Sequence, residues 1–257
     1  MIITFLTDFG TADSYVAEVK AVLVSRVPAA VLVDITHDVP PGDIRAAQYL
    51  LSRAWPHFPA GTVHLAVVDP AVGTERRAIA AETSGHHFVA PDNGLLSFLP
   101  PDARFVTLPV APDASPTFHG RDVFAPAAAE IASGKSLAKM GEPIRQPQCA
   151  PLPRPQTQDG EVIGEVLYVD RFGTLISNIT PELIMAGARI RVAGTDVGAL
   201  QRTFADVTHG ELLAFTGSGG TVEIAVRDGS AALKLNVGVG AKVTVGTTVD
   251  ETTAKRR

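Results

Sequence analysis

Three aspartates, Asp8, Asp34 and Asp69, each close a short apolar run. In an open parallel sheet, ligands bind beyond the carboxyl ends of the strands, so carboxylates at three such ends would face one crevice. They could hold a cationic ligand there or accept a proton. Each could instead simply cap the next helix or turn, and we favour that alternative for Asp34.

The segment from Val68 to Arg77 combines a buried run with a forced turn. Pro70 and Gly73 require a tight loop directly after the apolar run. Asp69 and Arg76, seven residues apart, can then fold back on each other across that loop. A carboxylate paired with a guanidinium stays ionised at neutral pH. Such pairs are often only structural, so the spacing alone does not establish catalysis.

His119 lies between an aromatic residue and Gly120, just before a helix predicted over residues 123–132. At the start of a helix it could enter the crevice as a catalytic group, or it could cap the helix or pack in the core. His86 and His87 follow Gly85 and precede Phe88, and we interpret them as surface or sheet-edge residues.

Several common functional motifs are missing from the sequence. There is no G-x-G-x-x-G dinucleotide fingerprint, no H-E-x-x-H and no clustered Cys/His metal pattern. Gly134-Lys135-Ser136 is like the end of a phosphate-binding loop, but Ala129 stands where that loop needs its leading glycine. The Asp8-Phe9-Gly10 tripeptide also occurs in kinases, yet no kinase elements precede it.

The composition limits the possible partners. Lys and Arg number 22 against 27 Asp and Glu, a formal net charge of −5, which argues against a nucleic acid partner. No apolar run could span a bilayer, so we expect no membrane partner. The only cysteine, Cys149, cannot form an internal disulfide, and no signal peptide is recognisable. We therefore expect a cytoplasmic protein, with Lys255-Arg256-Arg257 as a solvated tail.

These residues must be positioned by two kinds of structure. Over residues 1–142, apolar runs alternate with helical patterns, and the runs are continuous, as is typical of parallel strands covered on both faces. This predicts an α/β domain with a mostly parallel sheet. The predicted strands are 2–6, 30–33, 63–68, 78–81 and 88–90, and the predicted helices follow Asp13, cover 44–51 and cover 123–132.

The pattern then changes. Residues 143–160 contain five prolines and are predicted to be a linker. Residues 161–250 hold short strand candidates punctuated by glycines, which favours a smaller all-β, barrel-like domain. Residues 251–257 are predicted to be a tail.

Taken together, the motifs resemble the SAM hydroxide adenosyltransferases, where SAM is S-adenosyl-L-methionine. This family is related to the enzymes that make fluoro- and chloro-adenosine from SAM. The resemblance runs in order from Ile3 to about Val245. It rests on Thr7-Asp8-Phe9-Gly10, Asp34-Ile35-Thr36-His37, Val68-Asp69-Pro70-Ala71-Val72-Gly73, Ala90-Pro91-Asp92-Asn93-Gly94, Phe118-His119-Gly120-Arg121-Asp122, Asp170-Arg171-Phe172-Gly173, Gly217-Ser218, Glu223-Ile224-Ala225 and Gly229-Ser230-Ala231.

The resemblance implies hydrolysis of SAM to adenosine and L-methionine, by attack of water or hydroxide at ribose C5′. The family's hydroxide-handling Asp, Arg and His fall on Asp69, Arg76 and His119. A sulfonium is already a good leaving group, so the enzyme's task is mainly to place the water in line. We therefore expect no metal or redox cofactor.

The resemblance also implies a set of substrate contacts and an assembly. The assembly is a homotrimer, with each site between the first domain of one chain and the barrel of its neighbour. Asp8 matches the acid that holds the ribose hydroxyls, Asp170 and Ser218 match contacts to the methionine amino and carboxylate groups, Phe118 and Phe172 match walls around the adenosine, and Thr174, Asn178 and Glu223 lie in matching segments as further substrate contacts.

Two alternatives remain at this point. A SAM-dependent 5′-halogenase is disfavoured, because the halogenases have Tyr at the position of Asp69 and a small hydroxyl residue at that of Val72. They also carry an inserted loop in the first domain, which has no counterpart in this sequence. A non-catalytic SAM or adenosine sensor is disfavoured by the intact Asp, Arg and His set. Thr174 and Gly219 depart from relatives that have Asn and Arg there, which affects the methionine end of the site.

Overall fold

The computed structural model describes residues 1–246, and the chain divides into two compact units between Leu152 and Pro153. The predicted tail, residues 251–257, and the last four residues of the predicted second domain lie outside the described residues. Within residues 1–246, none of the helices has the length and apolar character needed to cross a bilayer.

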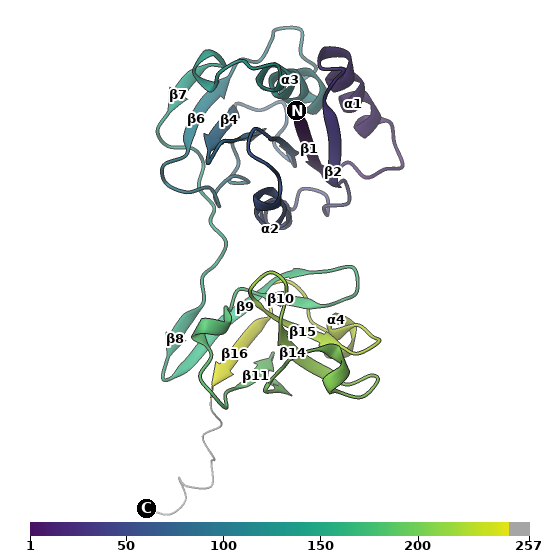
Figure 1. The fold of residues 1–257 in the computed structure, drawn as a ribbon, viewed down its shortest axis with the longest axis vertical. Coiled ribbons are helices and arrows are strands. Elements are labelled where there is room, and N and C mark those ends of the chain that lie inside the picture. Colours follow the sequence, from purple (N-terminus) through teal and green to yellow (C-terminus); the bar gives the residue numbers. More distant parts are fainter. Residues whose placement is uncertain (247–257) are drawn as a thin grey trace, which may run out of the picture. The chain divides into compact units, whose positions relative to one another are not determined.

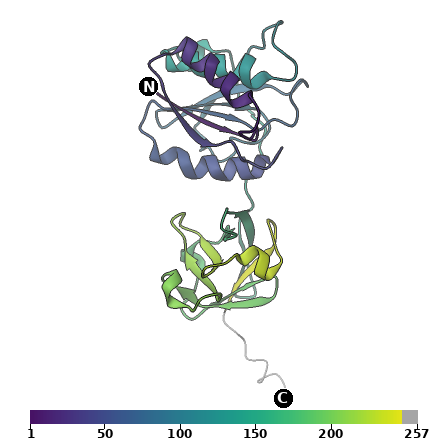
Figure 2. The ribbon, with the colours of Figure 1, turned by 90° about the vertical axis from the view of Figure 1, so that its right-hand side faces the viewer.

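The first unit is a seven-stranded sheet between two layers of helix (Figures 1 and 2). Helices α1 (Tyr15–Arg26) and α3 (Ala125–Ala132) cover one face, and α2 (Ile44–Ala54) covers the other. In the order in which they pair, the strands are β2 (Val31–Thr36), β1 (Ile2–Thr7), β3 (Val63–Val67), β5 (His86–Pro91), β4 (Ala78–Thr83), β6 (Arg104–Leu108) and β7 (Glu142–Ile144).

This sheet is mixed, so the prediction of a mostly parallel sheet is not confirmed. Strands β2, β1, β3 and β5 are parallel neighbours, whereas β4 is antiparallel to both β5 and β6, and β7 is antiparallel to β6. The cause is the two-residue turn Ser84-Gly85, whose φ angles of 50° and 76° suit a type I′ hairpin. An apolar run buried on both faces does not reveal its direction, so the pattern could not show this.

The hairpin also corrects the interpretation of His86 and His87. Both lie in β5, which is an interior strand between β3 and β4. His86 is only 6% exposed, so the expectation of a surface or sheet-edge position was wrong. Its buried position follows from the turn, which begins the strand immediately after Gly85.

The helices begin where the sequence supplies a reason. The Asp43 side chain accepts a hydrogen bond from Ala46 N at 2.9 Å and so caps α2. Helix α1 begins after Ser14, rather than at the expected cap Asp13, and its Val19 and Leu23 are fully buried. Helix α3 is rich in alanine and is preceded by a five-residue π turn, Gly120–Phe124. Short 3-10 turns lie at Trp55–His57 and Leu137–Lys139.

The second unit is a nine-stranded, barrel-like sheet, as predicted. Strand β9 pairs with β16 on one side and with β10 on the other, and β8 adds to it. Its core includes Val166, Ile190 and Ile224. The elements are β8 (Gln156–Gln158), β9 (Glu161–Val169), β10 (Leu175–Ser177), β11 (Arg189–Val192), β12 (Thr195–Gly198), β13 (Leu200–Gln201), β14 (Leu212–Thr216), β15 (Val222–Val226), β16 (Lys242–Gly246), helix α4 (Ala231–Leu235), and 3-10 turns Pro181–Leu183 and Phe204–Asp206.

The segment predicted as a linker is divided between the units. Its start lies in β7, and residues 146–150 are bound to the first unit. The Asp92 carboxylate accepts a hydrogen bond from Gln148 N at 2.7 Å, and Ser97 Oγ accepts one from Ala150 N at 2.8 Å. Its later part forms β8 in the second unit.

Candidate functional site

Asp69, Arg76 and His119 form one buried cluster in the first unit. Arg76 Nε donates to the two Asp69 carboxylate oxygens at 2.9 and 3.0 Å, and its Nη2 also contacts Asp69 Oδ2. The same Nη2 donates to His119 Nδ1 at 2.9 Å. The Arg76 and Asp69 side chains are only 7% and 5% exposed. The pair is therefore shielded from bulk water, and its geometry is set by the fold.

The mixed sheet explains why these residues meet. Asp69 follows the carboxyl end of β3, and Arg76 comes just before β4. Because β4 runs opposite to β3, the beginning of β4 stands at the same edge as the end of β3. Between them Gly73 has φ +78°, and a Cβ there would lie 2.4 Å from Pro116 O. The loop can pack against the segment that leads to His119 only because this residue is glycine.

The contacts determine the protonation of His119. Arginine only donates hydrogen bonds, so Nδ1 accepts and the imidazole proton lies on Nε2. Burial, followed by the positive charge of Arg76, lowers the pKa of His119, which keeps the ring neutral at pH 7. Within residues 1–246, the buried Arg76 Nη1 has no hydrogen-bond partner. The cluster thus combines a carboxylate acceptor with N–H donors, which suits holding and polarising a small nucleophile.

Asp8 lies at the same sheet edge. Its Oδ2 accepts a hydrogen bond from Gly42 N at 2.8 Å, and a Cβ on Gly42 would lie 3.6 Å from Pro70, the neighbour of Asp69. Asp34 differs, because it stands inside β2 and pairs with Lys20 at 2.6 Å. Asp34 therefore forms ion pairs from within the strand and is not the helix or turn cap that the sequence favoured.

Phe118 joins this edge through aromatic contacts. Its ring centroid lies 5.9 Å from that of Phe9 and 5.3 Å from that of Tyr15, both edge to face. Phe9 immediately follows Asp8, so the ring group connects the predicted ribose contact with the turn that carries His119.

The second unit gathers another group of the predicted residues. A pocket of about 760 Å³ is lined by Asp170, Phe172, Thr174, Ser218 and Glu223. Asp170 Oδ1 accepts hydrogen bonds from Phe172 N at 2.9 Å and from Thr174 N at 2.8 Å, which shapes the loop after β9. That loop presents the Phe172 ring, which is 77% exposed in the single chain.

Asn178 is not among the residues that line this pocket. Its Oδ1 accepts from Glu165 N and its Nδ2 donates to Pro153 O, both at 2.9 Å. It is 8% exposed. Both ends of the amide therefore hold β9 against the chain entering the unit, and the substrate contact expected of Asn178 stays a prediction.

The sequence interpretation missed two aromatic residues of the pocket. Phe204 and Phe215 line it, with ring centroids 4.8 Å apart. Phe204 is a lone large apolar residue in the polar stretch 202–206 and is 44% exposed. That isolation is the signal that could have identified it. The position of Phe215 depends on β14 pairing with β15, which no local pattern reveals.

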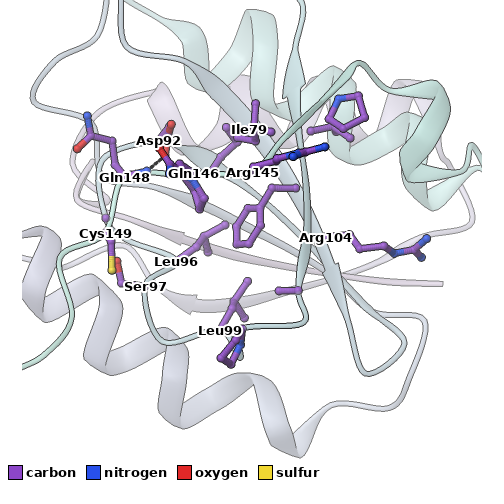
Figure 3. A pocket seen from close by; sticks show the side chains of 18 of the residues that line it. Ile79, Asp92, Leu96, Ser97, Leu99, Arg104, Arg145, Gln146, Gln148 and Cys149 are labelled. Carbon is purple, nitrogen blue, oxygen red and sulfur yellow. Dashed lines mark hydrogen bonds between the residues drawn. The ribbon is translucent and has the colours of Figure 1, made fainter.

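A larger cavity of about 900 Å³ contains none of the predicted residues (Figure 3). It lies against β4, β6 and β7 under the segment 143–149. Its Asp92 is already bound to Gln148 N and to Arg77. Its lining is mostly apolar, and it has no counterpart of the Asp69 cluster, so size alone does not locate the chemistry.

Two family models match the chain. The model of the SAM hydroxide adenosyltransferase N-terminal domain matches residues 3–141, and that of the C-terminal domain matches residues 164–244. The (R)-S-adenosyl-L-methionine hydrolase of Thermus thermophilus is 43% identical over 253 residues, which covers 93% of this chain and 97% of that protein.

Further similarities extend the comparison. The crystal structure of an uncharacterized conserved protein from Thermotoga maritima matches with a TM-score of 0.88 at 38% identity, covering 95% of this chain and 99% of that one. A fluorinase from an Actinoplanes species is more distant, at 29% identity over 292 residues, covering 95% of this chain and 97% of that protein.

Proposed function

Because the chain belongs to the SAM hydroxide adenosyltransferase family, we propose that it hydrolyses SAM to adenosine and L-methionine. The observation that carries the proposal is the buried cluster of Asp69, Arg76 and His119. A protein that only bound SAM would have no need to bury an ion pair against a neutral imidazole.

In the proposed reaction, a water oxygen attacks ribose C5′ from the side opposite the sulfur. The new C–O bond forms as the C–S bond breaks, methionine leaves with the electron pair on its sulfur, and the water proton is released. Asp69 accepts or orients that proton, while Arg76 Nη1 and His119 Nε2 donate to the attacking oxygen. The positive sulfonium is already activated, so we propose that no metal or redox cofactor is needed.

The remaining predicted residues would bind the substrate. Asp8 would hold the two ribose hydroxyls, and Phe118 and Phe172 would flank the adenosine. The carboxylates also suit the positive charge of SAM. Asp170 and Ser218 would contact the methionine amino and carboxylate groups, with Thr174 and Glu223 beside them. Their gathering in one pocket of the second unit supports this division of labour.

We propose the (R)-sulfonium epimer as the substrate, because the Thermus relative is an (R)-S-adenosyl-L-methionine hydrolase. Separate incubation with (R)- and (S)-SAM tests this point. Equal rates for the two epimers would contradict it.

The halogenase alternative is weaker. Asp69 and Val72 are not the residues that the resemblance requires for a halide site. The alignment to the fluorinase extends over 292 positions although this chain has 257 residues, so the fluorinase carries segments that this chain lacks.

One incubation separates these activities. Purified protein is given SAM in chelator-treated buffer, with and without halide, and the products are separated chromatographically. Adenosine and methionine in equal amounts are expected in every condition. Dominance of 5′-haloadenosine, dependence on metal, or SAM binding without any product would each overturn the proposal.

We further propose a homotrimer in which the first unit of one chain and the second unit of its neighbour form each site. Head-to-tail interfaces close naturally in cyclic symmetry. Asp69→Asn and Asp170→Ala chains are unfolded, mixed and refolded together. With shared sites, about a quarter of the sites regain both intact halves by random assortment. No recovery in trimers verified by sedimentation would refute the shared site.

We also propose a cytoplasmic location without a nucleic acid partner. The exposed, unpaired thiol of Cys149 is of the kind that persists in a reducing compartment. The net charge of −5 disfavours binding to nucleic acid. Cell fractionation with an antibody against the protein tests the location.

A further inference from the structure

The turn that carries Phe118 and His119 is held by one guanidinium, that of Arg121. Arg121 Nε donates to Asp122 Oδ1 at 2.7 Å, and Nη2 donates to Asp122 Oδ2 at 2.9 Å. Asp122 Oδ2 also accepts a hydrogen bond from Ser115 N at 2.9 Å. Asp122 therefore ties the chain just before the turn, at Ser115, to the chain just after it. The two parallel hydrogen bonds from the forked Arg121 guanidinium hold the Asp122 carboxylate in place.

The third nitrogen of Arg121 reaches a different element. Its Nη1 donates to Glu18 Oε2 of α1 at 2.9 Å, and the other Glu18 oxygen accepts from Ser14 Oγ at 2.7 Å. The hydrogen bonds from Ser14 and then Arg121 lower the pKa of Glu18, so this carboxylate stays charged. The turn is thereby bound to the first turn of α1, over a sequence separation of 103 residues.

The flat face of Arg121 is also used. Its Cζ lies 4.9 Å from the centroid of the Phe118 ring, while Phe9 and Tyr15 meet that ring edge on. A Cβ on Gly120 would lie 3.1 Å from the Phe9 ring and 3.4 Å from the Phe118 ring, so the backbone of the turn packs closely against both rings. The Phe118 ring is thus restrained by the guanidinium as well as by its aromatic neighbours.

These contacts are not expected to contribute much to the stability of the fold. The side chains of Arg121 and Glu18 are 35% and 37% exposed, and ion pairs at such sites contribute little to folding. The network instead fixes the geometry of the turn. The planar guanidinium binds Asp122, stacks on the Phe118 ring and contacts Glu18 of α1, so it restrains the turn from three directions. His119 Nδ1, at the centre of that turn, meets Arg76 at 2.9 Å.

We propose that Arg121 is a positioning residue for the reaction, which sets where the Phe118 ring and the His119 imidazole stand. This inference rests on the proposed hydrolysis of SAM. Arg121 has no contact with the Asp69 carboxylate among its hydrogen bonds, and it acts on the reaction through Phe118 and His119. A lysine could keep the charge but could not reproduce the fork together with the stack.

The test compares Arg121→Lys and Arg121→Met with Arg104→Met, which removes an exposed ion pair to Glu82 elsewhere in the same unit. All three variants should melt within a few degrees of the wild-type chain. Both Arg121 variants should lose about tenfold or more in kcat/KM for SAM, because small displacements of positioned groups are costly. The loss should divide between a higher KM, through Phe118, and a lower kcat, through His119.

The outcomes are distinct. If the wild-type chain is active and Arg121→Lys has the same kcat/KM as Arg104→Met, the positioning role is wrong and the proposed hydrolysis still holds. A wild-type chain that releases no adenosine would remove the proposed function and this inference with it. If Arg121→Met does not fold, Glu18→Gln loosens the same network from α1. A several-fold loss in kcat/KM supports the proposal, and unchanged kinetics contradict it.

Discussion

The molecule contains two Asp–Arg pairs with the same spacing and the same hydrogen-bond pattern. Asp69 and Arg76 are seven residues apart, and so are Arg189 and Asp196. In both pairs the arginine Nε donates to both carboxylate oxygens and Nη2 contacts Oδ2. In the first pair the side chains are 7% and 5% exposed, and in the second 41% and 44%.

The difference lies in what surrounds each pair. Arg189 of β11 pairs with Asp196 of β12 at the exposed hairpin, where water screens the charges and the pair has little energetic consequence. Arg76 also contacts His119 and stands over the Phe124 ring at 5.1 Å. An Asp–Arg spacing therefore predicts a salt bridge, whereas burial at the sheet edge and an imidazole partner distinguish the pair that we propose to be catalytic.

The largest effect on the buried pair is expected from Asp69→Asn, which keeps the shape of the carboxylate but removes its charge. We expect turnover of SAM to fall about a hundredfold or more, the scale of general-base and electrostatic groups. SAM affinity, measured by calorimetry, should be largely kept. Turnover close to wild type would mean that this pair, like the exposed one, is only structural.

Asp8→Ala should act on binding. A hydrogen bond to a charged group contributes about 1.5–3 kcal/mol, so loss of a contact to the ribose hydroxyls should raise KM about tenfold or more. Because that contact is made equally in the ground and transition states, kcat should change little. Steady-state kinetics separate the two parameters, and a fall confined to kcat would place Asp8 in the chemical step instead.

His64 tests whether burial alone is sufficient. It is 0% exposed, its Nδ1 lies 2.8 Å from Thr4 Oγ1, and its Nε2 lies 3.1 Å from His86 Nδ1. Burial, and then the neighbouring His86 and His87, lower the pKa of His64 from its ordinary value of 6.5 to about 3. His64 belongs to no ion pair among residues 1–246, so we expect it to affect stability and not turnover.

The sign of the pH effect follows from that pKa. Between pH 6.5 and about 3 the unfolded chain binds a proton that the folded chain rejects, so stability is full above pH 6.5 and falls on acidification. The loss is about 1.4 kcal/mol per pH unit within this window. Urea unfolding at pH 7, 6 and 5 should show this slope, reduced in His64→Gln. An equal slope in that variant would show that other groups carry it.

Asp196→Asn should have the smallest effect. The exposed pair is worth less than about 1 kcal/mol, so the free energy of unfolding should change by no more than that, and turnover should stay at the wild-type value. Urea unfolding and a SAM assay, run beside Asp69→Asn, provide the measurement. A large loss of turnover would remove burial as the distinguishing property of the two pairs.

The sequence could predict the parts of the site that are local. The contact of Asp69 with Arg76 follows from their short separation and from Pro70 and Gly73, which reverse the chain between them. His119 lies 43 residues from Arg76, so its place depends on how the turn before α3 docks on the sheet. Only its chemical type, beside an aromatic residue and a glycine, could be noticed in advance.

The direction of β4 shows the limit of pattern reasoning most clearly. Its apolar run is continuous, as in a parallel strand, and the run itself carries no sign of the Ser84-Gly85 hairpin that reverses the chain. Yet that reversal brings Arg76 to the edge where Asp69 stands. The second unit was easier to classify, because glycine-punctuated short strands are typical of barrels, while its Phe204–Phe215 contact depends on tertiary packing.

Strand β7 has a consequence for how the protein behaves at high concentration. It closes one side of the first sheet with three residues, and the middle one is Pro143. Fibrils grow when new strands add to an open sheet edge, and a proline nitrogen offers no hydrogen to such a strand. This border of the sheet is therefore protected against polymerisation by the chemistry of its own backbone.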